Sequence, residues 1–78
     1  MNNSILLSSL SHGKKCRVKN LNTEGLLRRR LLDLGLIDDT EIEVLQKSPS
    51  GDPVAYLVRG AVIALRSEVT SMIVVEKV

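Results

Sequence analysis

Turn-forming residues divide this chain into short apolar stretches, and this pattern limits the fold more than any other feature. In some stretches apolar residues alternate with polar ones, as in half-buried strands. In others several apolar residues follow one another, as in fully buried strands. The stretches are residues 14–21, 40–47, 54–58, 61–66 and 72–77. A turn cluster at residues 48–53 and a tight turn at Arg59 and Gly60 separate the middle three. The pattern predicts about five short strands, including a hairpin with an ordered loop at its tip.

One helix is expected between the first two strands. Asn22 and Thr23 are good N-cap residues, and Glu24 follows where the helix dipole favours negative charge. Gly35, directly after Leu34, supplies the left-handed position that commonly ends a helix. The sequence therefore predicts a helix that starts near Glu24 and ends at Leu34.

This helix has an apolar face. Leu27, Leu31 and Leu34 fall at i, i+4 and i+7, so they lie on the same side. We expect stability to depend most on burial at Leu31, Leu34, Val44 and Ile63, where truncating a Leu or Ile to Ala typically costs about 2 to 5 kcal/mol. Leu34→Ala in particular is expected to lower the denaturation midpoint sharply.

Length and composition narrow the fold class. A chain of 78 residues makes one compact domain, and its hydrophobic content of 44% is enough for an aliphatic core. About five short strands with one inserted α-helix predict a mostly β domain, a small SH3-like barrel over residues 1–78.

Composition also excludes several classes of binding protein. Tyr56 is the only aromatic residue, whereas readers of single-stranded nucleic acid and grooves for Pro-rich peptides need several aromatic side chains. The net charge of +2 is too small to attract polyanions or membranes to the whole molecule. No nucleic-acid partner is expected, and binding of nucleic acid through residues 28–30 is the weakest alternative.

The chain also carries signals about its compartment. Cys16 is the only cysteine, so no internal disulfide can form, and a reducing compartment fits best. The first ten residues have no charged start and only three consecutive apolar residues, too little for a secretory signal. No apolar stretch approaches the roughly 18 residues of a membrane span. We expect a cytoplasmic protein without membrane insertion.

Candidate residues for chemistry are few. His12 and Cys16 have a spacing that could supply two ligands to a soft metal, but structural zinc usually takes four. The preferred interpretation makes Cys16 a small buried hydrophobe and His12 a solvated loop residue. Neither has the base and carboxylate partners of a nucleophilic site. We therefore assign no catalytic residue and expect no required cofactor, with weak binding of a divalent transition metal as the alternative.

Two segments could present a binding surface. Three consecutive arginines at residues 28–30 spread over about 200° of the helix circumference. They form either a solvated face or an anchor for carboxylate or phosphate groups. Two prolines order the loop at residues 48–53, which suits a presented binding tip as well as a stable turn. Both interpretations stay open for each segment.

Several short motifs occur in a characteristic order and spacing. They are residues 30–36 (RLLDLGL), Thr40, residues 48–53 (SPSGDP), residues 58–60 (VRG) and residues 64–66 (ALR). In these motifs the chain resembles the ferrous-iron transport protein A (FeoA) family from about Leu7 to Glu76. The resemblance implies an SH3-like β-barrel with an inserted helix. Two positions depart from the family: Asp39 stands where Gly is usual, and Ser50 replaces an apolar residue.

The resemblance implies a small cytosolic accessory of the bacterial ferrous-iron permease, a membrane protein with a cytosolic GTP-binding domain. Such an accessory acts by protein–protein contact rather than by catalysis. The expected contact residues are Arg28, Arg29, Pro49, Asp52 and Arg66. A similar domain at the C-terminus of iron- and manganese-dependent transcriptional repressors makes a metal-sensing domain the alternative, with the ion bound through His12, Cys16 or nearby carboxylates.

Overall fold

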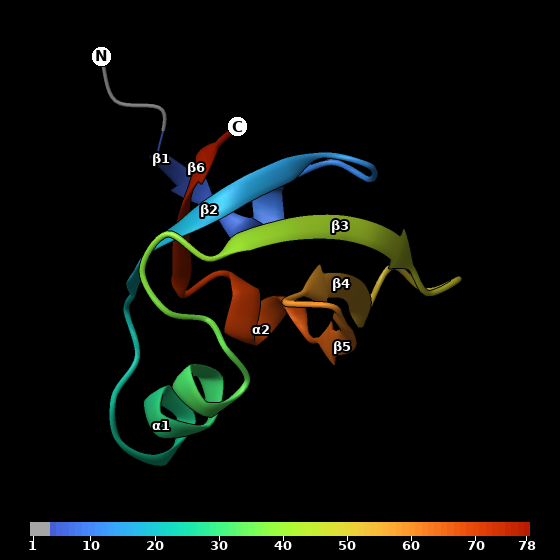
Figure 1. Cartoon of the computed structure of the whole chain (residues 1–78). Coiled ribbons are helices and arrows are strands. Elements are labelled where there is room, and N and C mark those ends of the chain that lie inside the picture. The colour runs from blue at the N-terminus through green and yellow to red at the C-terminus, as the bar shows by residue number, and fades with distance from the viewer. Residues whose placement is uncertain (1–3) are drawn as a thin grey trace.

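The computed structural model describes residues 4–78 and consists of six strands, two short helices and one helical turn (Figure 1). The strands are β1 (Ser4–Leu6), β2 (Lys15–Leu21), β3 (Glu41–Lys47), β4 (Val54–Val58), β5 (Ala61–Leu65) and β6 (Ile73–Lys77). The helices are the 3-10 helix η1 (Leu7–Ser9), α1 (Gly25–Asp33) and the single turn α2 (Ser67–Thr70). The predicted class, mostly β with one inserted helix, is confirmed.

All six strands form one antiparallel sheet in the order β1-β6-β2-β3-β4-β5. Register shifts between Val18 and Asn20 in β2, and between Val44 and Gln46 in β3, interrupt the ladders where bulges bend strands. Figure 1 shows α1 apart from the sheet, on the side of α2, with β4 and β5 forming a hairpin. The two edge strands are β1 and β5.

The prediction of about five strands missed β1. This strand has only three residues, and it pairs with β6, which comes last in the chain. A three-residue stretch shows too little alternation to be separated from a loop by its pattern. Its pairing partner β6 lies far away in the sequence, so only the folded structure shows the pairing.

The core follows the predicted alternation. In β2, Cys16 and Val18 are buried while Arg17 and Lys19 between and beside them are exposed. The buried apolar residues are Leu7, Leu10, Cys16, Val18, Leu21, Leu31, Leu36, Ile42, Val44, Val54, Tyr56, Val58, Leu65, Ile73 and Val75. The prediction that Cys16 is a buried hydrophobe is confirmed.

Helix α1 begins later than its N-cap signals suggest. The N-cap is Glu24, and no side chain caps the helix. The Asn22 N–H donates to the Met72 carbonyl (2.7 Å) and its side chain accepts a bond from Asn20 (2.6 Å). Thr23 is buried, and its Oγ1 has no hydrogen-bond partner. Because the N-cap is Glu24 and neither Asn22 nor Thr23 donates or accepts a capping bond, the N-cap prediction at these two residues is wrong.

The end of α1 forms a Schellman motif. Gly35 adopts a φ of 100°, and its N–H donates to the Leu32 carbonyl (3.0 Å), while the Leu36 N–H donates to the Leu31 carbonyl (3.1 Å). The predicted left-handed Gly35 is therefore confirmed. The motif turns the chain so that Leu36 enters the core with no exposed surface.

The predicted buried face of α1 is only partly correct. Leu31 is 1% exposed, as expected, but Leu34 is 37% exposed. Leu34 is the C-cap of the helix, and the core position that we assigned to it is filled by Leu36 beyond the turn. Val44 is buried and Ile63 is half-buried. The expectation of a sharp loss of stability in Leu34→Ala is therefore corrected.

Two left-handed residues other than glycine shape the connections. Asp39, at the position where Gly is usual in the resembling family, has a φ of 66°, and Asp tolerates this region better than most residues. Arg59 and Gly60 have φ values of 51° and 83° and make the two-residue turn between β4 and β5.

In the described part of the chain, neither α1 nor α2 is long and apolar enough to cross a membrane.

Candidate partner-binding groove

A groove of about 490 Å³ lies between α1, β5 and α2, and we call it the α1–β5 groove. It is lined by Leu27, Arg30, Leu31, Leu34, Ile63, Ala64, Leu65, Arg66, Glu68 and Val69. The Schellman motif places Leu34 at its wall instead of in the core. The groove therefore exists because α1 ends there and the chain turns inward.

The floor of the groove is apolar and incompletely covered. Leu31 and Leu65 are buried beneath it, whereas Leu34, Ile63 and Val69 keep part of their surface in solvent. Apolar surface that stays exposed in a concave site favours contact with another apolar group. This floor can hold apolar side chains of a partner.

The charged residues of the groove are Arg30 on α1 and Arg66 and Glu68 on the opposite side. Arg30 makes no ion pair within residues 4–78. Arg66 lies 3.6 Å from the Asp52 carboxylate, and both side chains keep substantial exposure. An exposed pair of this kind stabilises the fold only weakly, so the Arg66 guanidinium can also bind an incoming carboxylate.

Asp52 has a second role at this site. Its Oδ1 accepts the backbone N–H of Ser67 at 2.8 Å, which ties the loop at residues 48–53 to the start of α2. The loop itself is closed by the Ser48 N–H to the Pro53 carbonyl (3.1 Å) and the Gly51 N–H to the Ser48 carbonyl (2.8 Å). The predicted ordered loop at the tip of a hairpin is therefore present.

The structure separates the predicted contact residues into two groups. Asp52 and Arg66 meet beside the groove, and Pro49 lines a shallow hollow that shares Ala64 with it. Arg28 instead donates to the Leu21 carbonyl at 2.8 Å. Neither it nor Arg29 lines the α1–β5 groove. The choice of these five residues as a partner-binding surface stays a prediction.

Sequence reasoning missed Arg30 as the arginine that faces the groove, and it missed the exposed edge of β5. The residue that faces the groove is one of the three consecutive arginines at residues 28–30. Which of the three it is depends on the rotation of the helix about its axis, and the leucines that face the core set that rotation. Leu31 alone is buried in α1, and Arg30 precedes it at the rim. Arg30 falls three residues after Leu27 and four before Leu34, both of which line the groove, and this i, i+3, i+7 spacing is the signal that could have found Arg30.

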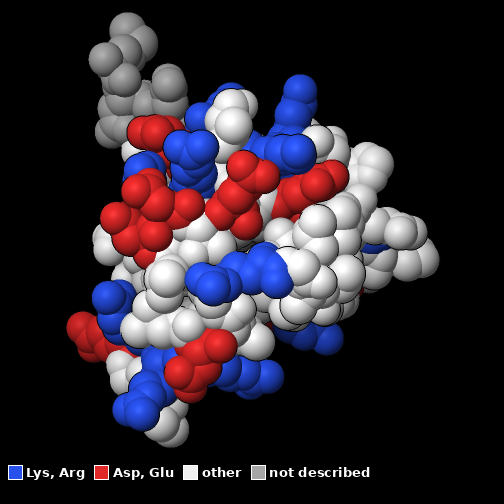
Figure 2. Space-filling view, in the orientation of Figure 1, with Lys and Arg blue, Asp and Glu red and all other residues white. Residues whose placement is uncertain are grey.

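Charges elsewhere on the surface are largely balanced. The register pairs Lys15 with Glu43 and Arg17 with Glu41, and Figure 2 shows basic and acidic side chains interleaved over β2 and β3. The surface over β4 and β5 is mostly uncharged in the same view. In the turn before β3, the Asp39 Oδ1 accepts a hydrogen bond from Lys19 Nζ of β2 at 2.6 Å. This bond lowers the pKa of Asp39 and raises that of Lys19.

The two candidate metal ligands lie in different surroundings. Cys16 has no exposed surface, and burial, with a smaller contribution from the charge of Glu41, raises the pKa of its thiol to about 11. His12 is exposed in the turn before β2. Residues 4–78 contain no group of three or more His, Cys, Asp or Glu side chains placed to hold a metal ion. Metal binding through His12 and Cys16 stays a prediction.

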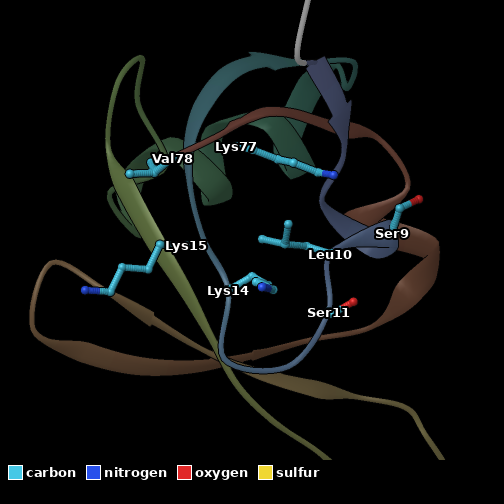
Figure 3. A pocket seen from close by; sticks show the side chains of 7 residues that line it. All are labelled: Ser9, Leu10, Ser11, Lys14, Lys15, Lys77 and Val78. Atoms are coloured by element: carbon cyan, nitrogen blue, oxygen red, sulfur yellow. The ribbon is translucent and has the colours of Figure 1, made fainter.

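A second hollow of about 230 Å³ lies between η1, the following turn and the end of β6 (Figure 3). Lys14 and Lys77 line it together with Ser9 and Ser11. Lys15 also belongs to its lining, but Figure 3 shows its side chain pointing away from the other labelled residues. This hollow shares no residue with the α1–β5 groove. A substitution that changes a charge here is therefore a suitable control for the same change in the groove.

Comparison with known proteins places this geometry in a family. The family described as FeoA domain matches residues 5–77. A curated relative from Porphyromonas gingivalis (strain ATCC BAA-308 / W83), the Fe(2+) transport protein A/Fe(2+) transporter FeoB fusion protein, is 33% identical over 70 residues. The alignment covers 90% of this chain and 8% of the relative, so the chain spans a small part of that protein.

Solved structures show the same fold. The FeoA protein from Chlorobium tepidum has a TM-score of 0.90 at 32% identity, over 95% of this chain and 70% of that one. The FeoA protein of Stenotrophomonas maltophilia, complexed with zinc and described as a prokaryotic SH3 domain protein, has a TM-score of 0.82 at 26% identity. That alignment covers 92% of this chain and 89% of the other. The predicted SH3-like fold is confirmed.

Proposed function

Because this chain belongs to the FeoA family of ferrous-iron transport proteins, we propose that it is a regulatory adaptor of the ferrous-iron permease. In this proposal it acts by docking on the cytosolic GTP-binding part of that transporter, without catalysis and without entering the membrane. Docking biases the transporter toward one of its states, since a partner that prefers one conformation shifts the population toward it.

The observation that carries the proposal is the fusion in the Porphyromonas gingivalis relative. There a segment similar to this chain belongs to one polypeptide with the FeoB transporter. A covalent link keeps two units at a high effective concentration and so favours contact between them. We extend this association to the present chain.

The α1–β5 groove is the surface that suits such a contact best. It combines a partly exposed apolar floor with Arg30 and Arg66 at its sides. Interfaces typically place apolar contacts in the centre and charged groups at the rim, and Arg is enriched among residues that dominate binding energy. The loop anchored by Asp52 borders the same region.

The test is a titration of isotope-labelled protein with the cytosolic GTP-binding region of the permease from the same organism, followed by backbone amide shifts. We expect shifts around α1, β5 and the loop at residues 48–53. Arg30→Glu should weaken binding by about tenfold, since it replaces an attractive charge by a repulsive one at the groove.

Lys14→Glu is the matched control, because it makes the same change of charge in the other hollow. It should leave the affinity within about twofold of the wild type, apart from long-range effects that salt screens. Absence of amide shifts at high micromolar concentrations of the permease region would contradict the proposal. Equal weakening by both charge reversals would contradict the assignment of the groove.

A further inference from the structure

Strand β5 is an edge strand without the usual protection. Natural sheets protect their edges with charged residues, proline, bulges or a covering element. The sequence of β5 is Ala-Val-Ile-Ala-Leu, and its register with β4 is unbroken over all five pairs. Val62 is 65% exposed, and Ala61 and Ala64 are exposed beside it. An unbroken apolar edge of this kind favours pairing with another strand.

The backbone groups that face outward can be assigned from the turn. A two-residue turn makes the flanking residues, here Val58 and Ala61, a hydrogen-bonded pair. Alternation along the antiparallel ladder then directs the N–H and C=O groups of Ile63 toward β4 and those of Val62 and Ala64 toward the open edge. Neither Val62 nor Ala64 makes a turn, loop or side-chain hydrogen bond within residues 4–78.

The open edge borders the α1–β5 groove. Ile63, Ala64 and Leu65 line one side of the groove, while Leu34 and Arg30 line the helix side. An extended segment that paired with Val62 and Ala64 would direct every second side chain toward the apolar floor. Carboxylates on such a segment would meet Arg30, which has no acidic partner within the described residues, and the exposed Arg66.

We propose that β5 binds an extended segment of the partner as a seventh strand, and that this segment carries apolar side chains together with Asp or Glu. The inference rests on the proposed function, because the partner is the cytosolic region of the permease. Backbone pairing supplies affinity, and the apolar floor with its two arginines selects the sequence.

A second copy of this chain fits the edge less well. Suppose that two copies pair antiparallel through β5, with Ile63 of one copy opposite Ile63 of the other. Arg66 of one copy then faces Gly60 of the other copy and lies close to Arg59 of that other copy. The same clash of charges occurs at both ends of the pair because a twofold interface repeats every contact. Like charges at these positions oppose self-pairing, whereas an acidic segment is attracted by them.

The decisive variant is Ala64→Pro. Proline removes the N–H that faces the open edge, while the bonds of Ile63 and Leu65 to β4 remain, and proline is tolerated on edge strands in this position. We expect the affinity for the permease region to fall by about tenfold or more, because one backbone bond is lost and the ring obstructs pairing. Ala64→Val keeps this N–H and is the matched comparison at the same position, so it should bind more tightly than Ala64→Pro by about fivefold or more.

A second pair of variants tests the charge of the segment and does not depend on proline. Val62→Glu and Val62→Lys both place a charge at an exposed position of the same edge. The Glu variant should bind more weakly than the Lys variant by about threefold or more, because like charges on facing strands repel. Equal affinities of these two variants would overturn the acidic character of the segment.

Hydrogen exchange supplies a direct readout. In the free protein the amides of Val62 and Ala64 should exchange fast and that of Ile63 slowly, and the permease region should slow the first two. If the wild type binds and Ala64→Pro binds equally well, β5 is not the docking edge, although the adaptor function stands. If the wild type does not bind at all, the proposed function fails. A concentration-dependent dimer abolished by Ala64→Pro would assign the edge to a second copy and overturn the proposal.

Discussion

The interior strands and the edge strand β5 are built from the same aliphatic residues, but their surroundings differ. Ile42 in β3 and Ile73 in β6 have no exposed surface, whereas Val62 in β5 is 65% exposed. Each interior strand has neighbours on both sides, while β5 pairs only with β4. The comparison teaches that apolar residue type does not distinguish a residue that holds the fold together from one available for contact. Position in the sheet makes that distinction.

Helix α1 contains the same contrast within one turn. Leu31 is 1% exposed and belongs to the core, and Leu34, three residues later, lines the groove with 37% of its surface exposed. Truncations on the core side should therefore lower the stability of the fold, and truncations on the groove side should mainly lower the affinity for the partner.

The largest effect is expected for Leu31→Ala. Removing a fully buried leucine side chain leaves a cavity and typically costs about 2 to 5 kcal/mol of unfolding free energy, a large share of the total in so small a domain. Urea unfolding followed by circular dichroism measures the loss. Leu26→Ala is the matched control, because Leu26 lies on the same helix and is 89% exposed. Similar losses in both variants would contradict the assignment of Leu31 to the core.

A smaller effect on stability is expected for Leu34→Ala. Because part of its side chain already contacts water, truncation should cost about 1 kcal/mol. The same variant should weaken binding of the permease region, since Leu34 contributes to the apolar floor of the groove. Paired measurements of the urea midpoint and of affinity check both statements. A loss of stability as large as that of Leu31→Ala would remove the contrast between the two leucines.

The smallest effect concerns the exposed pair of Lys19 and Asp39. Asp39→Asn keeps a residue that tolerates the left-handed backbone and removes the charge. The hydrogen bond from Lys19 holds the pKa of Asp39 below its ordinary value, so the pair adds stability at neutral pH that is lost as the pH falls through this lowered pKa. The pKa of Lys19 is raised above its ordinary value, so the stability that the pair adds is also lost as the pH rises through the pKa of Lys19.

Thermal unfolding of wild type and Asp39→Asn over a pH series measures this contribution. We expect a slightly lower midpoint for the variant at about pH 7, and a difference that shrinks toward zero as the pH falls through the lowered pKa of Asp39. The difference should also shrink in high salt, because both side chains are exposed. A difference that persists at the acidic end would assign the effect to the backbone at Asp39.

Local rules predicted much of the fold. Alternation identified the buried side of β2 and β3, since a strand with one face in water must alternate. Gly35 marked the end of α1, because the left-handed position of a Schellman motif strongly favours glycine. The candidate site was less predictable: Asp52 and Arg66 meet through folding of the loop onto α2, and Arg28 is taken up by the Leu21 carbonyl.

The sequence by itself determined where β2 to β6, the turns within the β3–β5 region and the end of α1 fall, because those choices depend on the conformational preferences and polarity of a few neighbouring residues. Only the tertiary structure decided that β5 is an edge, that Leu36 and not Leu34 completes the core, and that Arg30 faces the groove. These outcomes depend on which distant segments pack together. A strand's own residues cannot specify how many neighbours it will have.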